Sequence, residues 1–351
     1  MIFDVIEQAV VNNGILMAWL AIIVGLIVLV WSADQFIDGA QNMALHLGMS
    51  PLLVGILIVG FGTSAPEMMI SALAALKESP GIAIGNAFGS NVANIGLILG
   101  LTALITPIAA GVGIIKKEFP ALILVTLGVF VIMYDGHLSR IDGIILLATL
   151  IGILVWFARS DMVTDSDNPT TGSTAIDNVP KTPTTSLQKA IVWTLIGLAL
   201  LMGASQMFVW GATEVAVYFG VSDVVIGLTI VALGTSLPEL AASLAAIRKN
   251  EHDMALGNVV GSNLFNTLAV IGIAAIIHPL DYARNLLIRD WGIMFALTLA
   301  LFIFACRFGK VWQVDPATGL LRKLRLERYQ GALLLTAYIA YMVFLALSAF
   351  D

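Results

Sequence analysis

The chain has 351 residues, of which 59% are hydrophobic and only 11% are charged, and its formal net charge is −6. A soluble domain has about 25% charged residues, so this composition excludes a water-soluble enzyme and a disordered protein. The negative charge offers no basic surface for nucleic acid. One cysteine, Cys306, excludes a disulfide framework and a multi-cysteine metal site. The sequence therefore predicts an integral membrane protein.

Ten stretches are long and apolar enough to span a bilayer, because a transmembrane helix needs about 20 mostly apolar residues. They are 15–36, 51–76, 81–107, 118–134, 141–159, 189–217, 223–248, 253–277, 288–306 and 331–349. A β-barrel strand would alternate apolar and polar residues, and the run from Ile144 to Phe157 does not. We therefore predict an all-α fold. Asp4 and Glu7 precede the first apolar run without Lys or Arg, so we expect no cleaved signal peptide.

The stretch 160–188 differs from the rest because it is rich in Asp, Thr, Ser, Asn and Pro. Such a composition cannot bury a core. We interpret it as a cytoplasmic linker that acts as a plain tether; the alternative is a regulatory cation-binding loop. The linker divides the chain into two five-helix parts, 1–159 and 189–351.

The basic residues predict the orientation of the chain. With the N-terminus outside, the inner loops and span ends hold 13 of the 17 Lys and Arg residues, and the outer ones hold 4. Basic residues favour the cytoplasmic side of a membrane. We therefore expect a multi-pass protein of the inner (plasma) membrane with both termini outside.

The two halves are an internal repeat. A shift of 172 residues aligns 62–100 with 234–272 without a gap and gives 16 identities in 39 positions. The segment Gly62–Glu67 matches Gly234–Glu239 at every position but one. Because each half has an odd number of spans, the second half enters the membrane from the opposite side. The repeats are therefore predicted to be inverted, which is typical of secondary transporters with discontinuous helices near the midplane.

Each repeat places one glutamate inside an apolar span, Glu67 in the first and Glu239 in the second. A carboxylate at membrane depth is costly and marks a functional site by default; the alternative is a Glu that faces a loop or a water pocket. Pro66 and Pro238 remove a helical hydrogen bond from the carbonyl four residues earlier. We expect breaks around 60–63 and 232–235 that free backbone carbonyls, with Ser64 and Ser236 capping the half-helices that follow.

The next span of each half carries a polar stripe on one helix face, because its members are four residues apart. The stripes are Asn86, Ser90 and Asn94, and Asn258, Ser262 and Asn266. Ser90, Asn94, Ser262 and Asn266 are interpreted as ligands. For Asn86, Asn91, Asn258 and Asn263, two possibilities stay open: ligation, or bonding between neighbouring helices.

All of these donors are hard oxygens, which favour Ca²⁺, Mg²⁺ or Na⁺ over soft metals. Mg²⁺ tends to keep its waters, whereas Ca²⁺ takes 6–8 oxygens in flexible geometry. A dry cage of oxygens therefore suits Ca²⁺ better. The charge of −2 from two glutamates is neutralised equally by one Ca²⁺ or by two Na⁺, which provides a physical route to antiport.

The doubled GTSxPE…GNxxGSNxxN pattern resembles the repeats of the sodium/calcium exchanger family, within the cation/calcium exchanger superfamily. The resemblance covers nearly the whole chain, which looks like a compact prokaryotic member. It implies an antiporter of ten helices in two inverted repeats, whose first spans, 15–36 and 189–217, slide against the rest. It implies Ca²⁺ and Na⁺ as transported ions in a lipid bilayer, with no cofactor and no obligate protein partner.

The resemblance also implies roles for individual residues. The central Ca²⁺ ligands would be Glu67 and Glu239, with Thr63 and Thr235 as backbone-carbonyl ligands beside them. Flanking Na⁺ sites would be lined by Ser64, Ser90, Ser236 and Ser262. Further carbonyl donors would be Gly60 and Ala232, and the central polar pair would be Asn94 and Asn266. Some prokaryotic members have Asp at the place of Asn266, so this chain has one possible charge fewer.

These observations predict a Ca²⁺/Na⁺ antiporter that extrudes Ca²⁺. A proton/calcium exchanger of the same superfamily is the alternative coupling, and a passive cation channel is the alternative class. An intramembrane enzyme is disfavoured because no HExxH pattern occurs and all four histidines lie at or near predicted loops or span ends. Asp34 and Asp38, near the inner end of the first span, are expected to be solvated or interfacial.

Overall fold

The computed structural model describes residues 2–110, 112–167, 182–220, 230, 232–282, 284, 287–306 and 324–348. Several predictions fall partly outside these ranges: residues 168–181 of the linker, the start of the 223–248 span and the basic residues Lys181, Arg307, Lys310, Arg322 and Lys323. Elsewhere the chain is overwhelmingly helical, as its long, non-alternating apolar stretches predict.

The first half holds α1 (Ile2–Leu47), α2 (Pro51–Val54), π-helical η1 (Gly55–Gly60), α3 (Phe61–Thr63), α4 (Ala65–Leu76), α5 (Pro80–Val92), π-helical η2 (Ala93–Leu99), α6 (Gly100–Ile105), β1 (Ile108–Ala110), α7 (Val112–Lys116), α8 (Glu118–Ile132), β2 (His137–Leu138) and α9 (Arg140–Asp167).

The second half holds α10 (Leu187–Tyr218), α12 (Ala232–Thr235), α13 (Leu237–Arg248), α14 (His252–Leu264), π-helical η4 (Phe265–Val270), α15 (Ile271–Ile277), β3 (Leu280–Asp281), π-helical η5 (Leu287–Trp291), α17 (Gly292–Cys306), β4 (Leu324–Leu326) and α18 (Arg328–Ser348). Helix α9 thus continues into the stretch that the sequence assigns to the linker.

Seven helical stretches of the described chain are long and apolar enough to cross a membrane, and the bent pair 51–63 and 65–76 makes an eighth. Two of the ten predicted spans are not among them. The 118–134 stretch contains the 15-residue helix α8, and the 223–248 stretch begins outside the described residues.

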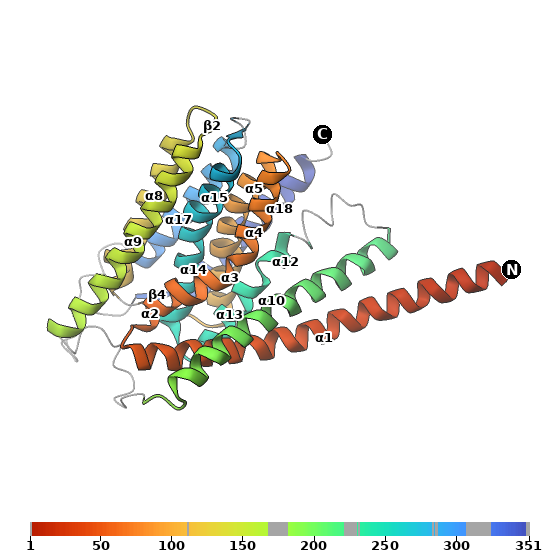
Figure 1. The fold of residues 1–351 in the computed structure, drawn as a ribbon, viewed down its shortest axis with the longest axis horizontal. Helices are drawn as coiled ribbons and strands as arrows, with labels where there is room; N and C mark the ends of the chain where they lie inside the picture. Colours follow the sequence, from red (N-terminus) through yellow and green to blue (C-terminus); the bar gives the residue numbers. More distant parts are fainter. Residues whose placement is uncertain are drawn as a thin grey trace.

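Helices α1 and α10 form a long antiparallel pair that lies obliquely along one side of the bundle (Figure 1). Glycines set their close approach. A Cβ atom built on Gly25 would lie 3.0 Å from the backbone nitrogen of Phe208, and one on Gly197 would lie 2.7 Å from that of Phe36. These two contacts are related by the same 172-residue shift as the sequence repeat. Small residues let helix backbones approach closely in membrane proteins, where packing replaces the hydrophobic effect.

The remaining helices form a bundle around two central spans, 80–105 and 252–277, which are the most buried of the candidate spans. Both spans are therefore enclosed by other helices on most sides. Two short antiparallel strand pairs, β1·β4 and β2·β3, join loops at opposite ends of the bundle (Figure 1). These pairs could not be predicted from the sequence, because strands of two or three residues have no measurable periodicity.

The C-terminal part of α1 is held to the α13–α14 hairpin by ion pairs. Arg248 lies 3.0 Å from Asp34, and Lys249 lies 2.7 Å from Asp38. Gln41 donates to Glu251 at 2.5 Å. Asp34 and Asp38 are partly exposed, as expected for interfacial residues, but each also forms an ion pair that the sequence analysis did not predict.

The α1–α10 packing predicts an effect of small substitutions. Gly197→Ala places a methyl group against the Phe36 backbone, so overpacking should lower the detergent Tm by about 3–8 °C. Gly203 lies on the same helix with nothing near its Cβ position, so Gly203→Ala should leave Tm unchanged or raise it slightly. Equal Tm values for the two variants, measured by thermal unfolding, would contradict this packing.

The β2·β3 loop pair contains a titratable contact outside the spans. The Nδ1 atom of His137 lies 2.6 Å from Asp281 Oδ1, and this hydrogen bond raises the pKa of His137 above its ordinary value of 6.5. The stabilisation from this contact is therefore complete below about pH 6.5 and is lost as the pH rises through the raised pKa. We expect histidine NMR titration to give His137 a lower pKa in Asp281→Asn than in the wild type, with His137→Gln assigning the resonance.

Candidate cation-binding site

The two repeated motifs break their helices where proline follows the turn. Pro66 and Pro238 each occupy the first turn of a new helix, α4 and α13, and the preceding turns fall at Ser64 and Ser236. The breaks thus come directly after the predicted stretches 60–63 and 232–235. In the first half, the axis bends by 43°. Proline causes this because it lacks the N–H that would continue the helical ladder.

The expectation that Ser64 and Ser236 cap the new half-helices is wrong. Both residues occupy the N-cap position, but neither side chain makes a capping hydrogen bond. Their backbone has φ near −81° and −92° with ψ near 0°, not the extended conformation of a capping serine. Both hydroxyls are instead buried without a hydrogen-bond partner, which leaves them free to bind a ligand.

The two glutamates lie in the first turns of α4 and α13 and are completely buried, with 0% exposure for Glu67 and 1% for Glu239. None of their four carboxylate oxygens makes a hydrogen bond. Glu239 of the second half interacts electrostatically with Glu67 and with the hydroxyls of Thr63 and Ser64, all three from the first half. The motifs of the two halves therefore meet at one place. A pair of buried carboxylates is stable only when a cation or protons neutralise it.

The stripe residues Asn86 and Asn258 turn out to hold the glutamates in place. Asn86 donates to the backbone carbonyl of Glu67 at 3.0 Å, and Asn258 donates to that of Glu239 at 3.2 Å. Each amide also donates at 2.9 Å to a serine one turn after the glutamate, Ser71 or Ser243. Of the two possibilities left open by the sequence, bonding between helices is the one observed.

Ser71 and Ser243 were missed by the sequence analysis. They are identical under the 172-residue shift and stand four residues after Glu67 and Glu239, so the alignment that revealed the glutamates also contained them. Both are fully buried. Two further asparagines of the motifs also bond to neighbours: Asn91 donates to Thr267 at 2.7 Å, and Asn94 donates to Asn263 at 3.1 Å.

Several side-chain oxygens of the motifs remain without partners. These are the Oδ1 atoms of Asn91, Asn94 and Asn266, together with the serine and glutamate oxygens described above. Buried polar atoms in proteins are almost always hydrogen-bonded, and a group of exceptions calls for a specific reason, such as a bound ion. The unpaired oxygens belong to residues that the sequence analysis had singled out, on both halves of the repeat.

The remaining predicted ligands lie on the same broken helices and central spans. Thr63 ends α3, and its hydroxyl has two acceptors, the Val59 carbonyl at 3.0 Å and Asn258 Oδ1 at 3.2 Å. Ser262 donates to the Gly60 carbonyl at 3.4 Å and thus joins the two halves. Ser90 is buried on α5, Thr235 ends α12, and Ala232 begins it. Within the described residues, no hydrogen bond joins Ser90 or Ala232 to the carboxylate oxygens of the two glutamates.

Three π-helical segments contain or adjoin residues of the site. The π-helical segment η1 ends at Gly60, η2 contains Asn94, and η4 contains Asn266. Segment η2 packs against α13, and η4 packs against α4, so each reaches the glutamate-bearing helix of the other half. Such segments frequently mark functional sites, because they displace carbonyls from the regular ladder.

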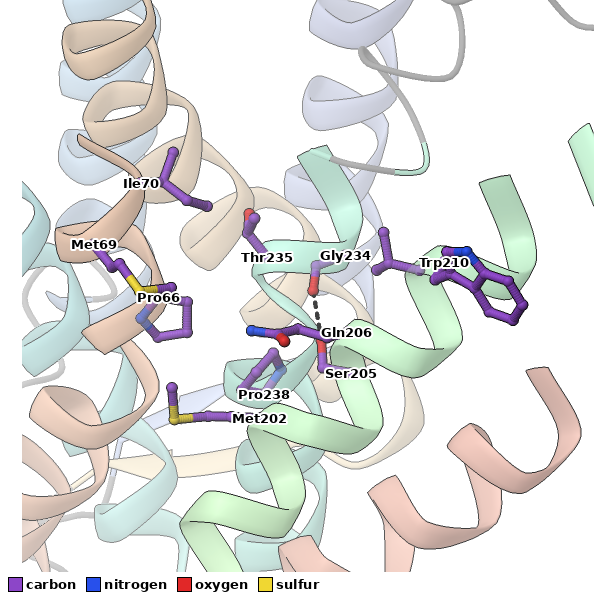
Figure 2. A pocket seen from close by; sticks show the side chains of 11 residues that line it. Pro66, Met69, Ile70, Met202, Ser205, Gln206, Trp210, Gly234, Thr235 and Pro238 are labelled. Atoms are coloured by element: carbon purple, nitrogen blue, oxygen red, sulfur yellow. Dashed lines mark hydrogen bonds between the residues drawn. The ribbon is translucent and has the colours of Figure 1, made fainter. Parts of the chain in front are cut away.

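A cavity of about 290 Å³ opens beside the site between α4, α10, α12 and α13 (Figure 2). Its walls include Pro66, Pro238 and Thr235 from the motifs and Ser205 and Gln206 from α10. In the part of the chain that the structure describes, no three or more His, Cys, Asp or Glu side chains could together hold a metal ion. A cation here would therefore be held by two carboxylates and by neutral oxygens.

Comparison with known proteins identifies the family. The family model described as "Sodium/calcium exchanger protein" matches residues 17–159 and 189–347. The chain belongs to the sodium/calcium exchanger family. It is 44% identical to the putative antiporter CaxA of Alkalimonas amylolytica, over 94% of this chain and 99% of that protein. It is 28% identical to the sodium/calcium exchanger MaX1 of Methanosarcina acetivorans, over 93% of this chain and 98% of that protein.

The fold agrees with a solved member of this exchanger family. A structure of the sodium-calcium exchanger NCX_Mj, soaked with zero Na⁺ and Ca²⁺, matches with a TM-score of 0.77 and 32% sequence identity, over 94% of this chain and 99% of that chain. This exchanger is thus an all-helical integral membrane protein of a transporter family, which confirms the class predicted from composition and from the doubled motif.

The hydrogen bonds beneath the glutamates predict a graded effect on stability. Asn258→Ala removes both donors to the Glu239 carbonyl and to Ser243, so it should cost about 1–3 kcal/mol of unfolding free energy. Ser243→Ala removes only one of these bonds and should cost less. Thermal unfolding in detergent measures both variants. A Ser243→Ala loss equal to or larger than that of Asn258→Ala would contradict the arrangement.

Proposed function

We propose that this exchanger moves Ca²⁺ in one direction and Na⁺ in the other through a single site built on Glu67 and Glu239. The observation that carries the proposal is the pair of fully buried glutamates whose oxygens make no hydrogen bond. Their charge of −2 is neutralised by one Ca²⁺ or by two Na⁺. Either load relieves the same electrostatic cost, whereas an empty site is expensive, and this difference favours exchange over leakage.

The proposed ligands are those that the family resemblance implies, and the chemistry of their donors is compatible with both ions. Ca²⁺ would be held centrally by the two carboxylates and by the backbone carbonyls of Thr63 and Thr235, with Asn94 and Asn266 as the central polar pair. Na⁺ would bind at flanking positions lined by Ser64, Ser90, Ser236 and Ser262 and by the carbonyls of Gly60 and Ala232. Hard oxygens suit both cations. The unpaired hydroxyls of Ser64 and Ser236 support these assignments most directly.

The proposal includes an architecture of ten spans in two inverted repeats, 1–159 and 189–351, joined by the 160–188 linker. Contacts that recur under the 172-residue shift support it. Asn86 and Asn258 make equivalent bonds, Gly25 and Gly197 make equivalent helix contacts, and the hairpins turn at the equivalent left-handed residues Glu78 and Asn250.

Alternating access would arise from the α1–α10 pair, which packs along one side of the bundle as a separate layer (Figure 1). The bias of Lys and Arg towards one side supports an inner-membrane protein with both termini outside. In that orientation, the Asp34–Arg248 and Asp38–Lys249 ion pairs lie at the cytoplasmic end.

Proton coupling is the second candidate, and one specific observation favours it. The central polar pair, Asn94 and Asn266, carries no charge, so only the two glutamates can balance incoming cations. The same glutamates could exchange two protons for one Ca²⁺. The name of the relative CaxA, a putative antiporter, does not specify a coupling ion.

The decisive experiment is Ca²⁺ uptake into proteoliposomes under an outward Na⁺ gradient, an outward H⁺ gradient or no gradient. We expect uptake driven by Na⁺, and loss of uptake to the level of empty vesicles in Glu67→Ala and Glu239→Ala, because each variant removes half of the balancing charge. Glu78→Gln is the matched control, since this glutamate lies exposed at the tip of a hairpin of the same half.

Three results would change the interpretation. Uptake driven by H⁺ alone would replace Na⁺ coupling by proton coupling. Uptake that ignores both gradients would indicate a passive channel. Normal uptake in either alanine variant would refute the site.

A further inference from the structure

Ser205 lies on α10, outside both repeated motifs, yet it contacts the backbone of the site. Its hydroxyl donates to the Gly234 carbonyl at 2.8 Å, across the wall of the cavity (Figure 2). Gly234 stands four residues before Pro238, whose missing N–H leaves that carbonyl without its helical donor. Ser205 is only 4% exposed. A buried side chain thus replaces the hydrogen bond that the proline removes.

The first half has no equivalent of this bond. The 172-residue shift places Ala33 of α1 at the position of Ser205, and alanine has no hydroxyl. The Cβ positions of Gly62 and its counterpart Gly234 show no such difference: a Cβ atom on Gly62 would lie 2.8 Å from Leu198 Cδ2, and one on Gly234 would lie closer still to Val209 Cγ2, so both face apolar side chains of α10. Ser32, beside Ala33, donates at 3.1 Å to Leu29 in its own helix. The two halves therefore share their motifs but differ in how α1 and α10 hold the broken helices.

We propose that Ser205 is a positioning residue: its bond to Gly234 fixes the broken helix of the second half in the geometry that binds cations. The inference rests on the proposed function, because the fixed segment leads directly into Thr235, Ser236 and Glu239. A ligand set held in place before binding costs less free energy to order when the ion arrives. The ligand-bearing segment of the second half is thus held in place before the ion binds, and the corresponding segment of the first half changes its geometry when the ion binds.

Loss of this bond leaves a buried carbonyl unpaired and lets the segment 232–239 rearrange. A hydrogen bond of this kind contributes about 1 kcal/mol, which corresponds to about a fivefold change in an equilibrium constant. We expect Ser205→Ala to raise the Ca²⁺ concentration for half-maximal uptake by about three- to tenfold, while the maximal rate stays within about twofold of the wild type. A purely structural role would instead lower the amount of folded protein and leave the half-maximal concentration unchanged.

Two variants sharpen the test. Ser205→Thr keeps the hydroxyl, and its extra methyl group has room because Ser205 lines the cavity. It should restore the wild-type half-maximal concentration. Ser32→Ala is the matched control: it removes a buried serine hydroxyl from the equivalent part of α1, but that hydroxyl bonds only within its own helix. It should leave the half-maximal concentration unchanged.

Hydrogen–deuterium exchange of the full-length protein without Ca²⁺ separates this inference from the proposed function. Peptides that cover residues 232–240 should exchange faster in Ser205→Ala than in the wild type and in Ser32→Ala. If the wild type shows no cation-driven uptake but this difference in exchange appears, the transport proposal fails, whereas the proposal that Ser205 holds the segment around Gly234 stands. Unchanged exchange, or an unchanged half-maximal concentration in Ser205→Ala with active wild type, overturns the positioning role.

Discussion

Two carboxylates buried against each other in an apolar bundle are the constraint on which the rest of this structure depends. Glu67 and Glu239 are inaccessible and make no side-chain hydrogen bond, so their mutual repulsion and their desolvation must be offset by something that binds. The protein fixes the position of the two glutamates by hydrogen bonds that leave their carboxylates charged. Asn86 and Asn258 hold the backbone of the glutamates, and Ser71 and Ser243 complete those bonds. The backbone carbonyls of the two glutamates are therefore hydrogen-bonded, whereas their carboxylate oxygens are not.

The broken helices also provide oxygen atoms near the two glutamates that could bind a cation. Proline after each turn removes a donor from the helical ladder, and π-helical segments displace further carbonyls close to the two motifs. Exposed backbone of this kind is tolerated at membrane depth only when protein or a cavity surrounds it. Here the two most buried spans, 80–105 and 252–277, provide that enclosure. Close packing by small residues then allows the helices to cross without separating the two halves.

Because the two halves are nearly symmetric, the positions at which α1 and α10 differ are informative. Under the 172-residue shift, the ion-paired Asp34 of α1 corresponds to Gln206 of α10, and Ala33 corresponds to Ser205. One helix is therefore joined to the bundle by charge near the α13–α14 hairpin, whereas the other is joined by a hydroxyl beside the site, next to a cavity. Identical motifs are thus held by different contacts, which gives the two halves different mechanical roles in the exchange we propose.

The sequence by itself determined the membrane class, the helical fold, the repeat and the residues of the motifs, because composition, period and spacing are local properties of the chain. It also located the helix breaks, since proline acts on its own helix. It failed on the serine caps, because the backbone at Ser64 and Ser236 is set by tertiary packing and not by residue preference. Only the tertiary structure decided that Asn86 and Asn258 support the glutamates, that Asp34 and Asp38 form ion pairs, and that Ser205 reaches Gly234. Each of these contacts joins residues far apart in the chain, and their geometry depends on how the helices pack.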